Sequence, residues 1–386
     1  MRSIVVAKFV PWPPNSGDKR RTLGIVRALR QHGPVTLCAF EGTDEDPEPL
    51  RAEGIDVQTV PLRRRPSDLI RSLLRSRSLT AARFWDRDLA SVVASAATSD
   101  ADVLVVEHVQ LLDYARRATA GLRVLDMHNV ESLLMARMAA AARGPRRLVY
   151  AAECRALRAL ERRATGADFV AVVSDADRTA LRPVVDHPRV VVVPNAWDEP
   201  NPLPPAEKPV VSFVALLSWG PNVQAATWFT ERVWPLVVDR LPDARLQLVG
   251  RNPTAEVRAL AGPTVRVTGS VPDLDPWYAR TRVSVAPLLA GGGSRLKILE
   301  SLAAGRPVVA TTIGAEGLED LVGRGVLVED APERMAAALV DLLTDRRTAE
   351  ALGRRGAEAV AADHSWTAAV RPLLDELTPG RGNEAG

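Results

Sequence analysis

The stretch GGGSRLKILESLAAGRPVVAT, residues 291–311, runs from a glycine loop into a helical pattern and then into an apolar strand. Glycines have no Cβ and let the backbone approach a ligand closely, and the N–H groups at a helix start favour an anion. Two cations, Arg295 and Lys297, stand where that helix is expected to begin. The stretch therefore predicts an α/β domain with a phosphate-binding loop at the end of a strand.

A carboxylate, Glu300, follows three residues after Lys297. We expect it to accept hydrogen bonds from ribose hydroxyls while the cations and the loop hold the oxygens of a diphosphate; the loop residues are Gly292, Gly293 and Ser294. The alternative is that Lys297 and Glu300 form an ordinary surface pair worth about 0.2–0.5 kcal/mol. That alternative leaves the glycine run unexplained.

Short apolar runs alternate with longer helical patterns over most of the chain, which favours parallel sheets covered by helices. In the first half the expected strands are 3–9, 35–40, 55–61, 102–107, 122–127, 168–173 and 190–194. In the second half they are 210–216, 245–250, 264–269, 282–287 and 307–311. The fold class expected is α/β, with two Rossmann-like doubly wound domains facing each other across a cleft.

Residues 195–209, NAWDEPNPLPPAEKP, contain five prolines and almost no apolar periodicity, so they are expected to link the two halves. A helix stripe near the end of the chain includes Trp366, Val370 and Leu373. The predicted organisation is a first domain over 1–194, the linker 195–209, a second domain over 210–364, a helix over 365–378 and a flexible tail over 379–386.

The composition is that of a soluble globular protein, with 386 residues, 46% hydrophobic and 25% charged. The apolar start, Ile4 to Val10, is too short for a secretory signal or a membrane span, and no run of 18 apolar residues occurs. Two cysteines, Cys38 and Cys154, give neither a disulfide framework nor metal-ligand spacing. A cytoplasmic protein is therefore expected.

The basic surplus, a formal net charge of +3, concentrates in arginine-rich segments. In the segment 63–87, several arginines surround Leu69, Ile70, Leu73 and Leu74, so it could lie on an anionic membrane. Alternatively, the apolar side of this segment packs on the sheet and its arginines are solvated. No nucleic-acid partner is expected.

Further polar residues follow the expected strands, where a ligand of an open α/β sheet binds. Gly17 begins a turn before a helix and could admit phosphate or sugar oxygens, although helix capping explains it almost as well. His128 follows 122–127 and could exchange hydrogen bonds near neutral pH, and His108 competes with it for that role. Asn222 and Arg251 stand after two strands of the second half, and arginine suits phosphate.

Seven stretches together resemble the retaining glycosyltransferases of family 4, which have the GT-B fold, and within them a bacterial branch with SWxPNV and GGxSRxK motifs. The stretches are SGDKRR (16–21), DMHNVE (126–131), VVPNAWD (192–198), SWGPNVQAATWF (218–229), VGRNP (249–253), VTGSVPD (267–273) and GGGSRLKILESLAAGRPVVAT (291–311). The resemblance covers nearly the whole chain and is most specific from Phe213 to Leu318.

This resemblance implies that the second domain binds a nucleoside-diphosphate-sugar and that the first receives the acceptor. It implies that Glu300 contacts the ribose, that the turn at Val271 lines the base pocket, and that His128 lies by the sugar and its leaving phosphate. It also implies that the last helix crosses back to the first domain. The acceptor would be a saccharide, a lipid-linked saccharide or a natural product.

Two departures from the family pattern bear on the mechanism. Gly292 stands where the commoner pattern has the first glutamate of a Glu-x7-Glu pair, and Pro221-Asn222 replaces the usual Lys-Gly. The phosphate would then be held by Arg295 and Lys297, with Arg251 as a helper. No suitable Asp-x-Asp motif occurs, so we expect transfer without a metal or other cofactor, and the alternatives are a nucleotide-sugar epimerase and a catalytically silent nucleotide-sugar-binding protein.

Overall fold

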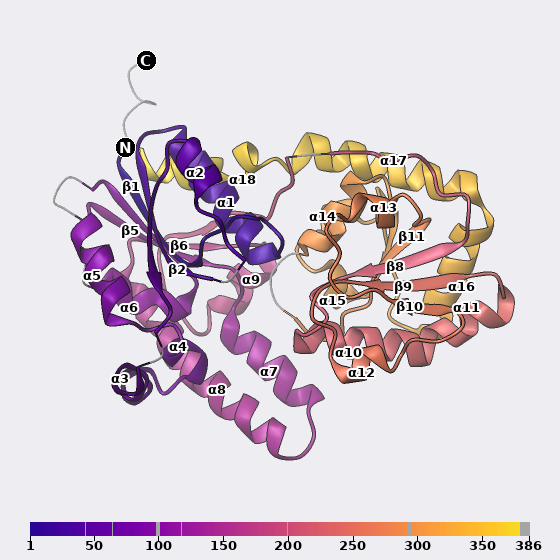
Figure 1. Ribbon diagram of the computed structural model, residues 1–386, viewed down its shortest axis with the longest axis horizontal. Coiled ribbons are helices and arrows are strands. Elements are labelled where there is room, and N and C mark those ends of the chain that lie inside the picture. Colours follow the sequence, from indigo (N-terminus) through magenta and orange to yellow (C-terminus); the bar gives the residue numbers. More distant parts are fainter. Residues whose placement is uncertain are drawn as a thin grey trace. The chain divides into compact units, whose positions relative to one another are not determined.

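The computed structural model describes residues 1–42, 44–63, 65–97, 101–116, 118–198, 200–291 and 295–378. The chain divides into two compact units, one formed by Met1–Pro194 together with the chain from Trp366 onward, the other by Asn195–Ser365. Each unit is one parallel sheet with helices on both of its faces (Figure 1).

The first unit contains a seven-stranded sheet in the order β3-β2-β1-β4-β5-β6-β7. Its strands are β1 (Ser3–Phe9), β2 (Val35–Glu41), β3 (Asp56–Pro61), β4 (Val103–Glu107), β5 (Leu122–Met127), β6 (Phe169–Val172) and β7 (Val190–Val192). Its α-helices are α1 (Gly17–Arg30), α2 (Glu48–Ala52), α3 (Pro66–Ser76), α4 (Leu79–Ala82), α5 (Arg87–Ala96), α6 (Leu112–Ala115), α7 (Glu131–Ala141), α8 (Pro145–Glu161), α9 (Asp175–Leu181) and α18 (Trp366–Leu377). Short 3₁₀ turns occupy Val109–Leu111 and Arg162–Gly166.

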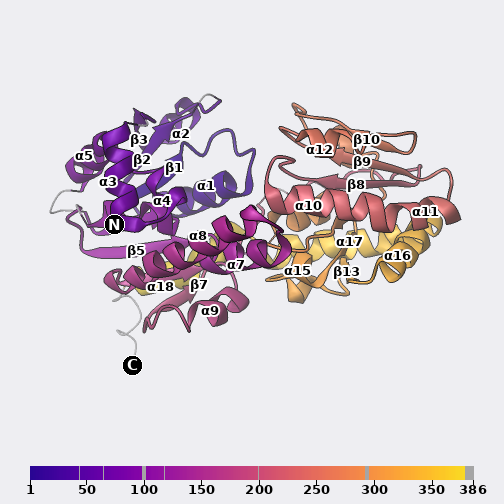
Figure 2. The same cartoon turned by 90° about the horizontal axis from the view of Figure 1, so that it is seen from below.

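The second unit repeats this plan with six strands in the order β10-β9-β8-β11-β12-β13 (Figure 2). Its strands are β8 (Val210–Val214), β9 (Arg245–Val249), β10 (Val265–Val267), β11 (Val283–Ala286), β12 (Val308–Ala310) and β13 (Val326–Val328). Its α-helices are α10 (Gly220–Trp228), α11 (Trp234–Arg240), α12 (Ala255–Arg258), α13 (Asp275–Tyr278), α14 (Leu296–Ala303), α15 (Thr312–Ala315), α16 (Pro332–Thr344) and α17 (Arg346–Asp363). A π-helical segment, Phe229–Val233, joins α10 to α11 just before Pro235, which has no N–H for a regular helical bond.

Both sheets follow the strand order of doubly wound nucleotide-binding folds, in which the direction of winding reverses beside the first strand. The reversal lies between β1 and β4 in the first unit and between β8 and β11 in the second. The fold class expected from the alternating pattern is therefore confirmed. The expected strands did not include β13, an edge strand of the second sheet.

The C-terminal helix α18 packs on α1 of the first unit. Trp366 is 9% exposed and lies so close to Gly24 that a Cβ built there would be 2.1 Å from the indole Cδ2. Only a glycine on α1 leaves room for this ring, so the contact between residues distant in sequence is sterically matched.

The proline-rich residues 195–209 lie against the second unit as far as the structure describes them. Trp197 and Asn201 donate backbone hydrogen bonds to the carbonyls of His364 and Ala303. The buried Arg306 guanidinium donates to the Pro204 carbonyl at 2.6 Å. Proline cannot donate a backbone hydrogen bond, but its carbonyl still accepts, so arginines fasten this segment where a regular strand cannot form.

Candidate functional site

The cation cluster of the second unit lies at the start of α14, which follows β11. Gly292, Gly293 and Ser294 lie outside the described residues. Arg295 occupies the N-cap position of α14 and is 6% exposed, whereas we expected it on the first helical turn. Its guanidinium packs over Gly291, where a Cβ would lie 2.5 Å from the NH2 nitrogen. Gly291 thus admits the arginine, a role that the sequence did not indicate.

Two weak polar contacts orient the Arg295 guanidinium. Its NH2 nitrogen donates to the Ile313 carbonyl at 3.3 Å and lies 3.9 Å from a Glu316 carboxylate oxygen. The second distance is too long for a strong charge-assisted hydrogen bond. The guanidinium is therefore buried beside a backbone carbonyl and near a carboxylate.

Lys297 lies in the first turn of α14, and its ammonium meets neutral groups. Its Nζ donates to Asn222 Oδ1 at 2.7 Å and stands 4.8 Å from the centre of the Phe213 ring. Burial lowers the pKa of Lys297 to about 7, the positive charge of Arg295 lowers it as well, and Glu300 acts in the opposite direction. A partly buried ammonium whose contacts are an amide oxygen and an aromatic ring favours binding of an anion.

Glu300 lies one turn after Lys297 on the same helix and contacts a tyrosine. The hydroxyl of Tyr278, which ends α13, donates to Glu300 Oε2 at 3.3 Å. Tyr278 is 2% exposed and also lies 3.4 Å from the Ser301 hydroxyl. The tyrosine was missed from the sequence because no motif spacing links the two helices. Its hydrogen bond orients the carboxylate that we expect to face a ribose.

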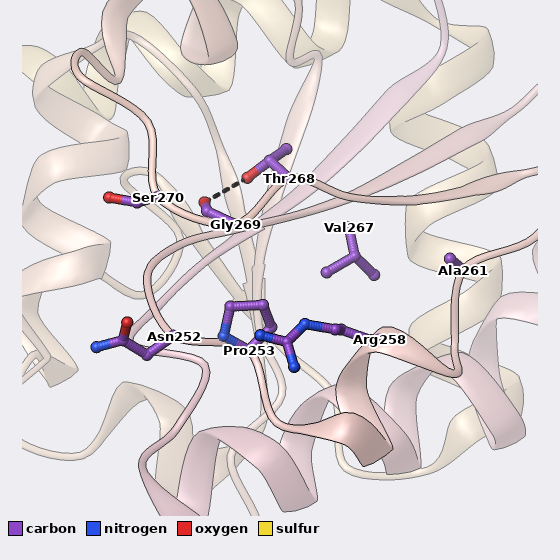
Figure 3. A pocket seen from close by; sticks show the side chains of 8 residues that line it. All are labelled: Asn252, Pro253, Arg258, Ala261, Val267, Thr268, Gly269 and Ser270. Carbon is purple, nitrogen blue, oxygen red and sulfur yellow. Dashed lines mark hydrogen bonds between the residues drawn. The ribbon is translucent and has the colours of Figure 1, made fainter.

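Arg251 and Val271 flank a pocket of about 490 Å³ at the carboxyl ends of β9 and β10 (Figure 3). Neither residue lines the pocket, but their immediate neighbours do. The lining residues are Asn252, Pro253, Arg258, Ala261, Val267, Thr268, Gly269 and Ser270. The pocket thus lies one residue away from Val271, where the resemblance implies a base pocket, and one residue away from Arg251, which was expected to help hold the phosphate.

In the first unit His128 lies at the carboxyl end of β5, between two carboxylates. Its Nε2 is 2.6 Å from Glu107 Oε2 and 3.3 Å from Asp126 Oδ2, and all three side chains are buried. Burial disfavours the charged imidazole, but hydrogen bonds with Asp126 and Glu107 raise the pKa of His128 above its ordinary value. The two carboxylates therefore favour the protonated form of His128.

Two consecutive residues of α1 hold these carboxylates. Arg21, which is 1% exposed, binds both oxygens of Asp126, with its Nε 2.8 Å from Oδ2. The Thr22 hydroxyl donates to Glu107 at 2.7 Å. Burial disfavours the Asp126 carboxylate, yet the Arg21 guanidinium and His128 hold its pKa well below the usual range. The sequence placed Arg21 in a family-like stretch but gave no sign of its partner 105 residues away.

His108, the competing histidine, stacks on His128 with ring centroids 3.7 Å apart. Burial and the positive charge of His128 lower the pKa of His108 well below its ordinary value, so this ring is neutral. Gly17, which was expected in a turn before a helix, is the first residue of α1. Its loop lies in the first unit, as does the histidine cluster.

Glu107, Asp126 and His128 are also the trio whose ligand atoms lie within 4.8 Å of one another, as a metal site requires, within the described part of the chain. His128 Nε2, both oxygens of Asp126 and one oxygen of Glu107 already bond to one another, to Arg21 or to Thr22. The arrangement is that of a buried network in which the two carboxylates lie beside an arginine and a histidine.

Sequence comparison finds a family match that lies within the second unit. Residues 208–345 match the family described as Glycosyl transferases group 1. This range holds the cation cluster, Glu300 and the pocket at β9 and β10.

Two curated relatives align with about a third of the chain. The phosphatidyl-myo-inositol mannosyltransferase of Mycolicibacterium smegmatis is 36% identical over 134 residues, covering 33% of this chain and 34% of that protein. A GDP-mannose-dependent alpha-(1-6)-phosphatidylinositol monomannoside mannosyltransferase of Mycobacterium tuberculosis is 32% identical over 169 residues, covering 39% of this chain and 43% of that protein. The chain therefore spans less than half the length of these relatives.

Solved structures resemble the chain over nearly its whole length. The sucrose-phosphate synthase of Thermosynechococcus elongatus has a TM-score of 0.71, 18% identity, and coverage of 97% of this chain and 98% of that chain. HepE of Anabaena in complex with UDP and glucose has a TM-score of 0.69, 16% identity, and coverage of 98% and 100%. At such identities the likeness establishes the fold, which is GT-B with two Rossmann-like domains.

Proposed function

We propose that this chain is a glycosyltransferase that moves a sugar from a nucleoside-diphosphate-sugar to an acceptor hydroxyl, with retention at the anomeric carbon and without a metal. The observation that carries the proposal is the pair of cations at the start of α14, the buried Arg295 and the partly buried Lys297, inside the segment that matches a glycosyl transferase family. Two neighbouring cations at a helix start bind an anion such as a diphosphate.

In the proposed reaction the bond between the anomeric carbon and the diphosphate oxygen breaks, and the acceptor hydroxyl attacks the same face of the sugar. The acceptor proton passes to the departing phosphate, and the products are the glycoside and a nucleoside diphosphate. Negative charge grows on the phosphate as the bond breaks, so fixed cations lower the barrier. Arg295 and Lys297 supply that charge in place of a metal.

Other residues of the proposal bind and orient. Glu300, held by Tyr278, accepts from the ribose hydroxyls, and the pocket beside Arg251 and Val271 receives the base. His128 acts as an orienting hydrogen-bond donor rather than a general base, because two carboxylates favour its protonated form. Asn222, Gly17 and the loop at Gly292, Gly293 and Ser294 complete the donor-binding set.

Thermal unfolding in the presence of candidate donors tests the proposal. A donor at 100 times its dissociation constant stabilises the native protein by about 2.7 kcal/mol, which raises the melting temperature. We expect a stabilising nucleoside-diphosphate-sugar among the common uridine, guanosine, adenosine and thymidine forms, and slow release of nucleoside diphosphate when no acceptor is present. Absence of any stabilisation across the panel contradicts the proposal.

The same samples separate the alternatives. An epimerase changes the sugar of the donor, which carbohydrate analysis detects, whereas a silent binding protein leaves the donor intact. A transferase releases the nucleoside diphosphate and retains the anomeric configuration in the glycoside. The NMR coupling constant of the new anomeric proton decides between retention and inversion.

We also propose that the acceptor is presented at an anionic membrane surface, at the inner face of the cytoplasmic membrane. Six of the eight large apolar side chains exposed among the described residues lie on α3, α4 and α8: Leu69, Ile70, Leu74, Leu79, Leu148 and Val149. Glu153 of α8 ties these helices together by accepting from the backbone N–H groups of Leu79 and Thr80. An apolar patch of this kind marks a binding surface.

The charges around this patch favour anionic lipid. Arg71, Arg77, Arg146 and Arg147 are exposed on the same helices or directly beyond them. Two other arginines of the basic segment are engaged elsewhere, since Arg65 binds Asp88 and Arg87 binds Asp68. The two curated relatives described above are named for phosphatidylinositol-based acceptors, which supports a lipid-linked acceptor here. A soluble acceptor is the alternative.

Flotation with vesicles of phosphatidylglycerol and phosphatidylcholine tests the membrane contact. We expect co-migration that weakens with salt and is lost in the Arg71→Gln, Arg146→Gln, Arg147→Gln triple variant, since each nearby cation contributes about 1 kcal/mol. The matched control replaces Arg354 and Arg355 of α17, which are also exposed, by glutamine. Absence of co-migration at low salt favours the soluble acceptor. Within the described residues, no helix combines the length and apolarity needed to cross a membrane.

A further inference from the structure

The amide of Asn222 has a single orientation that satisfies its surroundings. Asn222 lies at the start of α10 and is 4% exposed. Its Nδ2 donates to the Leu216 carbonyl at 2.9 Å, and its Oδ1 faces Lys297 Nζ at 2.7 Å. A carbonyl oxygen can only accept and an ammonium can only donate, so reversing the amide would break both bonds. Asn222 therefore offers the lysine a fixed acceptor.

The partners of Lys297 leave its charge unneutralised. The ammonium contacts the amide oxygen of Asn222 and the face of Phe213, and both groups are uncharged. Within the described residues no carboxylate oxygen forms an ion pair with it. The charged groups that act on it are Arg295, two residues before it, and Glu300, three residues after it on the same helix. Glu300 accepts a hydrogen bond from Tyr278.

We propose that Asn222 is a positioning residue that holds Lys297 at the diphosphate subsite without neutralising it, so that binding of a nucleoside diphosphate is accompanied by uptake of a proton. This inference rests on the proposed function, because it takes the diphosphate as the ligand. It goes further by assigning to Asn222 a role through Lys297 and by coupling nucleotide binding to pH.

The coupling follows from the electrostatics of the empty and filled site. Burial and the positive charge of Arg295 together lower the pKa of Lys297 to about 7, against the opposing effect of Glu300. Above that pH the empty site holds mostly neutral lysine. A diphosphate beside Nζ favours the charged form and raises the pKa, so a proton is taken from the buffer. A carboxylate in place of Asn222 would keep the lysine charged at all times and compete with the phosphate.

A purely structural role for Asn222 makes a different prediction. If the contact only ties α10 to α14, substitutions at Asn222 change stability but leave no proton linkage to nucleotide binding. Proton linkage is therefore the discriminating measurement, and it needs no variant in the first instance.

Calorimetric titration of the full chain measures the linkage. UDP, GDP, ADP and dTDP are each titrated at pH 8 in buffers of different ionisation enthalpy, and the slope of the observed enthalpy gives the protons exchanged. For the nucleotide that binds, we expect uptake of a substantial fraction of one proton. Lys297→Met should abolish the uptake. Equal enthalpies in all buffers overturn the inference while the proposed function stands, and absence of binding by all four nucleotides contradicts the proposed function itself.

Two substitutions on α10 then test the role of Asn222. Asn222→Asp keeps the size and adds a carboxylate, so we expect loss of the proton uptake and affinity weaker by roughly tenfold or more, the effect of a charge-assisted hydrogen bond. The control Gln224→Glu adds the same charge two residues later on the helix and should leave both quantities unchanged. Uptake retained in a folded Asn222→Asp variant overturns the assignment. If that variant does not fold, Asn222→Ser takes its place, because serine keeps an acceptor that is too short to reach Nζ. We expect this variant to bind the nucleotide more weakly. Unchanged affinity and unchanged proton uptake would also overturn the assignment.

Discussion

The two units use buried charge in opposite ways at equivalent places. In the first unit His128 lies between Glu107 and Asp126, Arg21 binds both oxygens of Asp126, and Thr22 donates to one oxygen of Glu107. In the second unit the Lys297 ammonium contacts an amide and an aromatic ring. Both clusters lie where the winding of a sheet reverses, so the fold supplies the position and the side chains decide the charge. A balanced network is suited to hold a group still, whereas an unbalanced one is suited to receive an anion.

The difference appears in the signs of the pKa shifts. The pKa of His128 is raised, so its contribution to stability is present below the unfolded value of about 6.5 and is lost as the pH rises through the folded value. The pKa of Lys297 is lowered to about 7. Between about pH 7 and the unfolded value near 10.4, the unfolded chain binds more protons at this lysine, so stability rises with pH there.

The strongest test of this comparison removes one cation from each cluster, Arg21 from the first and Lys297 from the second. Arg21→Met leaves the buried Asp126 without its main partner and should cost about 3–5 kcal/mol, because an uncompensated buried charge is strongly destabilising. Lys297→Met removes a desolvated charge that forms no ion pair with a carboxylate in the described part of the chain, and it should leave stability equal or higher at neutral pH. Urea and thermal unfolding of both variants measure the contrast. Equal destabilisation by the two substitutions would show that the clusters are alike.

A substitution at Lys297, in the second unit, should also change the rate of turnover. Lys297→Met is expected to slow donor cleavage by about 10²–10³-fold, the loss typical when one preorganised group that stabilises developing charge is removed. Donor affinity should fall less, because the charge on the leaving phosphate grows only in the transition state. Steady-state kinetics and calorimetry separate the two effects, with the exposed Lys208→Met as the control. A loss confined to affinity would show that Lys297 binds ground state and transition state equally.

The ribose contact should have a smaller effect. Glu300→Ala removes a charge-assisted acceptor worth roughly 1.5–3 kcal/mol and should weaken nucleotide affinity about tenfold to a hundredfold. Calorimetry with the nucleoside diphosphate measures it, and Glu333→Ala on the exposed side of α16 is the control. Unchanged affinity would remove Glu300 from the site.

The smallest expected effect concerns the protonation of His128. Glu107→Gln removes one of the two carboxylates that favour the imidazolium, so the pKa of His128 should fall toward its ordinary value. NMR titration of the His128 ring measures this directly and separates it from His108, whose pKa lies on the other side of the ordinary value. The control Glu53→Gln removes an exposed partner of Arg27 and should leave the ring unaffected. A constant His128 pKa would mean that Asp126 alone sets the charge.

Most of the fold could be predicted from the sequence because its signals are local. Each of the twelve expected strands begins and ends within two residues of the observed bounds, including 264–269 against β10 (Val265–Val267). Arg295, Lys297 and Glu300 could be identified as candidates because they too form a local signal, at one helix start after a strand. Their loop at Gly292, Gly293 and Ser294 lies outside the described residues and remains a prediction.

The sequence by itself determined the alternation of strands and helices, the position of the glycine loop and the residues that could meet a diphosphate, because periodicity and short spacings are properties of neighbouring residues. Tertiary structure alone decided the partners. It set Arg21 on Asp126, Lys297 on Asn222, Tyr278 on Glu300 and Trp366 on Gly24. The two residues of each pair are at least 22 residues apart in the sequence, and the most distant pair joins α1 to α18. Burial and contacts with other side chains shift a pKa, and no local sequence pattern encodes them. The charge that each site carries therefore depends on such pairs.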